Sequence, residues 1–158
     1  MMAEKVEGLA ELRTQFASVG TEMKTRTARG MVVSAGGVLK REAKRLAQEH
    51  GLLKTGALIN NIAIKREKTP DGIAQYHLGE RHGRDLGRKA EKKLVVGKSG
   101  RIVTRRENDP FYWFYHEFGT KKMQARPYIA PALENKRDAA IEAMEKRLAR
   151  DIEKANKK

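Results

Sequence analysis

The chain has 158 residues, enough for one domain. Its 34 lysine and arginine residues against 20 acidic residues give a net charge of +14. This charge favours polyanions or acidic protein surfaces as partners. It has no cysteine, so disulfides and cysteine-based zinc or iron–sulfur sites are excluded. No secretory signal and no apolar run of about 18 residues is present, which indicates a soluble product made in the cytoplasm, with no membrane partner.

Two helices are predicted in the first third of the chain. Residues 4–17 carry apolar side chains at helical spacing, and a longer helix follows from Thr21 to about Gly51. Gly51 is typical of a helix end. The pair Gly36 and Gly37 interrupts the apolar stripe, and each glycine costs about 1 kcal/mol relative to alanine inside a helix. We therefore expect a kink at this pair or a close approach of another backbone.

A β-hairpin is predicted next. Residues 58–64 and 73–79 contain β-branched side chains, with Ile62 and Ile64 in alternation, and the sequence Thr-Pro-Asp-Gly at 69–72 is typical of the turn between two strands. This hairpin supplies the antiparallel sheet of the expected fold, which spans residues 55–108 with its insertion.

Residues 81–106 form a basic insertion, with ten lysines and arginines against two acids. Two short apolar runs, 94–96 and 102–103, flank Gly-Lys-Ser-Gly and predict a protruding hairpin. We expect its cations to contact DNA in a channel or an acidic partner, although charge runs are often only solvated. The residues assigned to these contacts are Arg88, Lys89, Lys92, Lys93, Lys98, Arg101, Arg105 and Arg106.

Residues 109–133 are rich in aromatic side chains, with the only tryptophan, three of the four phenylalanines and three of the four tyrosines. A fully buried phenylalanine contributes roughly 1.5–3 kcal/mol, so we predict that residues 111–118 form a buried packing surface. Residues 119–131 then predict a turn, and helical spacing continues from Pro131 to about Asn156.

Three residues of this segment have specific expectations. Gly119 can adopt a positive φ and reverse the chain. Arg126, before Pro127, is suited to a bidentate pair with a carboxylate, and Glu117 of the same or the next chain is the candidate partner. Equally, residues 117–127 can be a turn that fixes the last helix on the sheet.

No catalytic motif is complete. Gly97-Lys98-Ser99 lacks the first glycine of a phosphate-binding loop, because residue 92 is lysine. His116-Glu117 begins like a zinc-protease helix, but residue 120 is threonine where the second histidine is needed. We expect no enzyme activity, no catalytic or metal site and no cofactor.

The sequence Tyr-His-Glu-Phe-Gly-Thr at 115–120, followed by Ala-Arg-Pro-Tyr-Ile at 125–129 and Pro-Ala-Leu-Glu at 131–134, resembles a family signature. It is similar to the Glu-Phe-Gly-Thr and Ala-Arg-Pro-Phe elements of tail completion, or head-to-tail joining, proteins of long-tailed bacteriophages. Residues 55–58, Thr-Gly-Ala-Leu, are similar to that family's Thr-Gly-x-Leu element. The resemblance covers residues 31–143. It departs at Tyr128, where phenylalanine is usual, and in the length of the basic insertion.

The resemblance implies a structural protein of the virion, located in the tail or neck. It implies a homo-oligomeric, hexameric ring with a DNA channel that joins the tail tube or tail terminator protein to a neck or head-completion protein. The residues expected at subunit or partner interfaces are Phe111, Trp113, Phe114, Tyr115, Glu117, Phe118, Arg126 and Tyr128.

The expected architecture is a single α+β domain. A long N-terminal helix and a C-terminal helix pack on a small antiparallel β-sheet, with a basic protruding β-hairpin or loop. Two other functions stay open. One is a nucleic-acid-binding accessory protein, and the other is a toxin-like enzyme, which is supported only by the basic charge of the chain.

Overall fold

The computed structural model describes residues 21–52, 56–70, 73–86, 92–106 and 108–157. The helix predicted over residues 4–17 lies outside this part of the chain. The described elements are α2 (Thr21–Glu49), α3 (Ala57–Asn61), β1 (Ile62–Arg66), β2 (Tyr76–Glu80), the 3-10 helix η1 (Gly83–Leu86), β3 (Lys92–Val96), β4 (Ile102–Arg106), α4 (Trp113–Phe118) and α5 (Ile129–Asn156).

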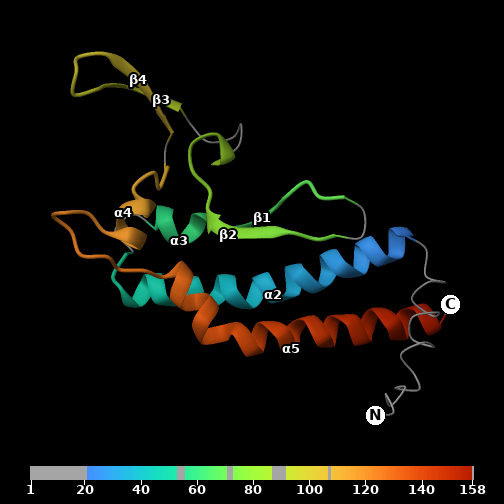
Figure 1. Ribbon diagram of the computed structural model, residues 1–158. Coiled ribbons are helices and arrows are strands. Elements are labelled where there is room, and N and C mark those ends of the chain that lie inside the picture. Colours follow the sequence, from blue (N-terminus) through green and yellow to red (C-terminus); the bar gives the residue numbers. More distant parts are fainter. Residues whose placement is uncertain (1–20, 53–55, 71–72, 87–91, 107, 158) are drawn as a thin grey trace, which may run out of the picture.

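The long helix α2 lies in the middle of the molecule (Figure 1). The helix α5 runs along one side of it, and the β1–β2 sheet packs on the other side. This arrangement confirms the α+β fold class, with two long helices and a small antiparallel sheet. The C-terminal helix packs mainly on α2, so α2 separates it from most of the sheet.

The prediction for the two glycines in α2, a kink or the close approach of another backbone, is wrong in both alternatives. The helix continues through Gly36 and Gly37 without a kink. A Cβ atom added at Gly36 would lie 2.8 Å from Cδ1 of Ile64, so this glycine makes room for a side chain of β1 and not for another backbone. The end of α2 is as predicted, because Gly51 follows it with a φ of 69°.

The first predicted strand, residues 58–64, is wrong in its first half. Residues Ala57–Asn61 form the helix α3, and β1 begins only at Ile62. Ala57, Leu58 and Ile59 are all buried, and an alternating strand cannot bury three successive side chains on one face. A helical turn brings Leu58 and Ile62 onto the same side, where both are fully buried.

Each sheet of the described chain consists of one antiparallel hairpin. In the first, β1 pairs with β2 from Ile62 opposite Glu80 to Arg66 opposite Tyr76. In the second, β3 pairs with β4 from Lys92 opposite Arg106 to Val96 opposite Ile102. Both strands of the second hairpin are longer than the apolar runs alone predict, because the flanking lysines and arginines continue the pairing.

The last helix begins two residues before the predicted start at Pro131 and ends at Asn156, as expected. A non-helical residue, Lys136, bends the helix after its first two turns, with a φ of −123° and a ψ of 19° (Figure 1). None of the described helices is both long enough and apolar enough to span a membrane.

The core lies where the C-terminal half of α2, the helix α3, the start of β1 and the start of α5 meet. Among the described residues, the only fully buried aromatic side chain is that of Tyr128. The other buried members are Ala43, Leu46, Ala47, Leu52, Leu58, Ile59, Ile62 and Ala132. The core is therefore small and aliphatic, and most of the aromatic side chains lie outside it.

Candidate functional site

The side chain of Glu117 fixes the start of α5. Its carboxylate accepts hydrogen bonds from the backbone N–H groups of Tyr128 at 2.9 Å, Ile129 at 3.2 Å and Ala130 at 3.0 Å. These are among the N–H groups that a helix N-terminus leaves without partners, and the helix dipole favours a negative charge there. Glu117 is also buried, so its interaction is within the chain.

Glu117 is therefore not the partner of Arg126, and it is not exposed to a neighbouring subunit, contrary to both predictions. The backbone N–H of Arg126 donates to the carbonyl of His116 at 2.7 Å, and its Nη1 donates to the carbonyl of His50 at 3.3 Å, at the end of α2. The structure thus supports the alternative in which residues 117–127 form a turn that fixes the last helix.

Gly119 makes this turn possible. Its φ is 74°, and a Cβ atom added to it would lie 2.8 Å from the backbone N of Ala125 and 3.0 Å from the carbonyl O of Met123. The backbone N–H of Thr120 donates to the carbonyl of Met123 at 2.8 Å and closes the loop. As predicted, the glycine is required by a positive φ, and the close backbone leaves no space for a larger residue.

Replacing Gly119 by alanine is expected to destabilise the protein by about 2 kcal/mol more than replacing Gly100 by alanine. Both glycines have a φ of 74°, but Gly100 has open space where the Cβ would be placed. Gly119 also has a ψ of −177°, which together with its positive φ is confined almost entirely to glycine. The comparison therefore measures the cost of the clash together with that of this backbone conformation. Urea unfolding of the two variants measures it, and equal midpoints would show that the turn relaxes to admit a Cβ.

Tyr128 is also buried within the chain, which corrects its assignment to an interface. Its hydroxyl donates to Oε1 of Glu80 at 2.9 Å, while Oε2 of Glu80 is buried without a partner among the described residues. Burial raises the pKa of Glu80 to about 7, against the effects of the Tyr128 hydrogen bond and the charge of Lys44. Burial and the neighbouring Glu80 likewise raise the pKa of Tyr128. This contact joins the start of α5 to β2.

The aromatic side chains of residues 111–118 are divided between the core and the surface. Trp113 and Tyr112 are partly buried and pack against the core. We call the outward-facing group the aromatic ridge; it consists of Phe111, Phe114, Tyr115 and Phe118, which are 57%, 52%, 49% and 63% exposed.

The prediction that residues 111–118 form a buried surface is therefore wrong for the ridge. Successive residues of a helix point in different directions, so five adjacent aromatic side chains cannot all face one core. Within the ridge, Phe114 and Phe118 are one turn apart, and their ring centroids are separated by 4.7 Å. Phe114, Tyr115 and Phe118 lie on the short helix α4, and Phe111 lies two residues before it.

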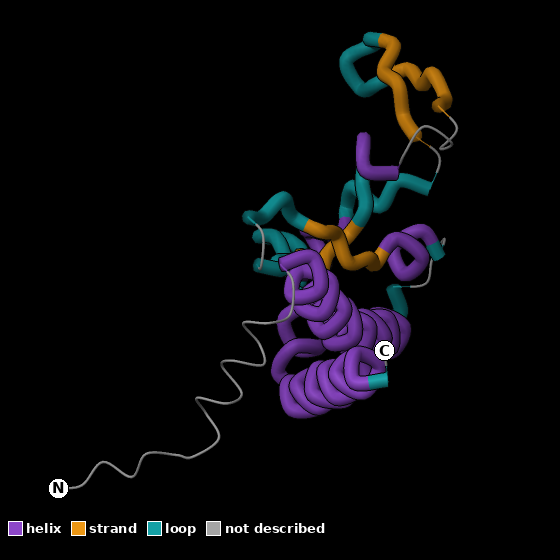
Figure 2. The backbone as a smooth tube through the Cα atoms, turned by 90° about the vertical axis from the view of Figure 1, so that its right-hand side faces the viewer, coloured by secondary structure: helices purple, strands orange, loops and turns teal. Residues whose placement is uncertain are grey.

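The β3–β4 hairpin extends away from the helices in both views (Figures 1 and 2). None of the residues 92–106 is buried. Of the predicted contact residues, Arg88 and Lys89 lie outside the described part of the chain. Lys92, Lys93, Lys98, Arg101 and Arg105 are exposed on the hairpin, and Arg106 is partly exposed at its base.

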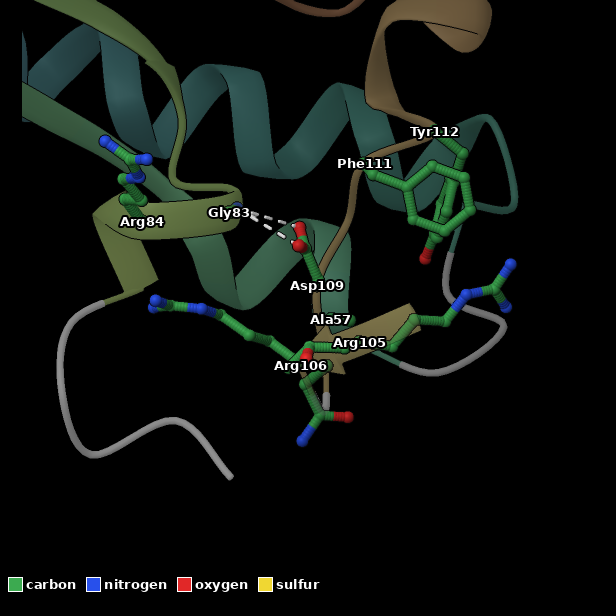
Figure 3. A pocket seen from close by; sticks show the side chains of 10 residues that line it. Ala57, Gly83, Arg84, Arg105, Arg106, Asp109, Phe111 and Tyr112 are labelled. Atoms are coloured by element: carbon green, nitrogen blue, oxygen red, sulfur yellow. Dashed lines mark hydrogen bonds between the residues drawn. The ribbon is translucent and has the colours of Figure 1, made fainter. Parts of the chain in front are cut away.

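A cavity of about 550 Å³ lies at the base of the hairpin (Figure 3). Asp109 closes one side, because its carboxylate accepts the N–H of Gly83 at 3.1 and 3.2 Å. The guanidinium of Arg105 lies 5.7 Å from the ring centroid of Phe111. Arg84, Arg105 and Arg106 point in different directions, so they do not converge on one ligand (Figure 3). The arrangement joins the hairpin to the body of the protein.

No group of three or more metal-ligating His, Cys, Asp or Glu side chains is found in the described ranges. The buried acidic residues Glu80 and Glu117 are bonded to Tyr128 and to the N-terminus of α5, and thus have roles in folding. The features that point outward are the aromatic ridge and the basic hairpin, which are surfaces for contact with other molecules.

Comparisons with protein-family models, with curated proteins and with solved structures give no significant match for this chain.

Proposed function

We propose that the protein is a structural component of a long-tailed bacteriophage, which assembles as a homo-oligomeric ring between the tail tube or terminator and the neck of the capsid. The observation that carries the proposal is the aromatic ridge, four large side chains that are about half or more exposed, three of them on the short helix α4 and Phe111 just before it. Large exposed apolar patches mark protein contact sites, and aromatic residues are enriched in protein interfaces.

The resemblance to tail completion proteins supports the same function through residues with definite structural roles. Glu117 holds the start of α5, and Gly119 makes the turn that follows α4. Together they fix α4 between the core and the turn, so the ridge is held in one orientation. A contact surface that is fixed before binding loses less conformational entropy on assembly.

Exchange of Phe114 and Phe118 for serine is expected to abolish or strongly weaken self-association while the fold is kept. Both side chains are more than half exposed, so their loss removes contact area between molecules and little area within the chain. Light scattering over a range of concentrations measures the association, and urea unfolding checks the fold. The control is Val33→Ser, on α2, which is 46% exposed.

Two results would contradict the proposal. One is a parent protein that stays monomeric at every concentration and within purified tails or necks. The other is a ridge variant that forms the same oligomer as the parent. Electron microscopy of particles that carry the tagged protein would test its position at the head-proximal end of the tail.

A second function, binding of nucleic acid, is favoured by the hairpin, where six lysines and arginines occur in residues 92–106 without an acidic residue. Phosphate contacts give affinities that fall steeply with salt. Tight, salt-dependent DNA binding by an isolated monomer would favour this function. Weak DNA binding together with ring formation would favour the assembly protein.

A further inference from the structure

The β3–β4 hairpin has one strongly apolar face. Residues directly opposite each other in an antiparallel pair point to the same face, and side chains alternate along each strand. Because Val96 lies opposite Ile102, these two share a face with Leu94. They are 71%, 72% and 76% exposed, the most exposed large apolar side chains of the described chain. We call this the apolar hairpin face.

An isolated two-stranded hairpin is at best marginally stable in water, so this face is expected to be covered in the working assembly. The charges limit what can cover it. Lys92 at the base and Lys98 at the tip lie at its two ends, and the hairpin carries no acidic residue. A DNA backbone would neutralise the cations but leave the apolar side chains in water. The surface that fits is therefore both apolar and acidic.

The helix α5 provides such a surface. Asp138 and Glu142 are one turn apart, as are Ile141 and Glu145, so the four side chains lie on neighbouring positions of one side. All four are exposed, and Ile141 is 47% exposed in spite of its apolar character. We call this the acidic side of α5. Glu142 is ion-paired with Lys146, so the acids beside Ile141 that can face the cations of the hairpin are Asp138 and Glu145.

We propose that the apolar hairpin face of one subunit docks on the acidic side of α5 of the next subunit. This inference rests on the proposed function, since it names the contact through which copies of the chain assemble. The hairpin and α5 lie on opposite sides of the molecule in both views, so the contact is not made within one chain (Figures 1 and 2).

The proposed contact is compatible with a ring. The two surfaces are different parts of the molecule, so each subunit offers one to the neighbour before it and the other to the neighbour after it. Such head-to-tail contacts produce a ring when the rotation closes, whereas a reciprocal contact, in which each hairpin docks on the α5 of the same partner, produces a two-fold dimer.

Disulfide trapping tests the contact directly, because the chain has no cysteine of its own. Thr104 lies opposite Leu94 and shares the apolar hairpin face, so Thr104→Cys places a thiol there. The variant is mixed with full-length Ile141→Cys protein and oxidised mildly. A disulfide between the two is expected. The control partner is Val33→Cys on α2, since Val33 is 46% exposed, like Ile141.

Charge reversal gives the second test. Lys92→Glu with Lys98→Glu, and separately Asp138→Lys with Glu145→Lys, are each expected to weaken self-association on the order of tenfold or more, since like charges then face each other. Both pairs of changes in one chain restore opposite charges and are expected to restore association. All four residues are exposed, so circular dichroism should show an unchanged fold.

The inference is overturned if Val33→Cys is trapped as efficiently as Ile141→Cys, or if the combined charge reversal does not restore association. It is also overturned if the hairpin variant loses DNA binding but associates like the parent. In these cases the protein still assembles, and the ridge experiment still decides the proposed function. A parent protein that never associates contradicts both.

Discussion

Replacement of Glu117 by alanine is expected to lower the free energy of unfolding by about 3–5 kcal/mol. Three backbone N–H groups at the start of α5 donate to this carboxylate, and the truncated side chain leaves them without an acceptor. The favourable interaction of a negative charge with the helix N-terminus is lost as well. Domains are stable by only about 5–15 kcal/mol, so this loss is a large part of the total.

Urea unfolding followed by circular dichroism measures the effect. Glu117→Gln keeps one side-chain oxygen as an acceptor and is expected to fall between the parent and the alanine variant. Glu134→Ala is the matched control, because Glu134 is exposed on α5, the helix that Glu117 holds, and is expected to change stability by less than about 0.5 kcal/mol. If Glu117→Ala and Glu134→Ala unfolded at the same urea concentration, Glu117 would have no part in holding α5.

The second large effect is a loss of stability as the pH rises from about 4.5 to about 7. The folded state raises the pKa of Glu80 from its ordinary value of 4.5 to about 7, mainly because the carboxyl is buried. Above pH 4.5 the unfolded chain releases this proton while the folded chain still holds it, so unfolding is favoured. Once the pH exceeds about 7, both states are ionised and the loss is complete.

The size of this loss is on the order of 3 kcal/mol at most. Glu80→Gln cannot ionise, so its unfolding free energy minus that of the parent is expected to increase across this interval and then stay constant. Tyr128→Phe removes the hydroxyl whose hydrogen bond to Oε1 lowers the pKa of folded Glu80. The upper end of the interval should therefore move to higher pH, while the lower end, set by the unfolded chain, stays at about 4.5. Urea unfolding at a series of pH values measures both. A difference curve that is flat between pH 4.5 and 7 would show that Glu80 ionises in the fold as it does in the unfolded chain.

The assembly proposal assigns different surfaces to different contacts. The aromatic ridge lies on α4 and just before it, at the end of the molecule near α3, whereas the acidic side of α5 lies beyond the bend at Lys136 (Figure 1). The charge-reversal and ridge variants therefore alter separate regions. If both are required for the ring, the ridge and the hairpin contribute to the same assembly through contacts that can be changed independently.

Sequence patterns correctly predicted those elements that depend on residues close together in the sequence. The apolar repeat of α2 and the glycine after it depend on helical periodicity and on the freedom of Gly51 to adopt a positive φ. The turn at Gly119 and the hairpin around residues 97–100 likewise follow from short-range rules. The prediction of a strand at residues 58–61 was wrong. It relied on the alternation of Ile62 and Ile64, whereas three successive buried side chains in contact with the core favour the helix α3.

For the segment 109–133, the sequence by itself determined that aromatic side chains gather there and that the chain reverses at Gly119 before a last helix. It could not determine which of them are buried, because that depends on the direction of each side chain relative to α2 and α3. The tertiary structure decided that Tyr128 enters the core, that Glu117 holds α5, and that Phe114 and Phe118 face outward. The physical reason is that burial and pairing are contacts between distant parts of the chain, which become definite only when the helices pack.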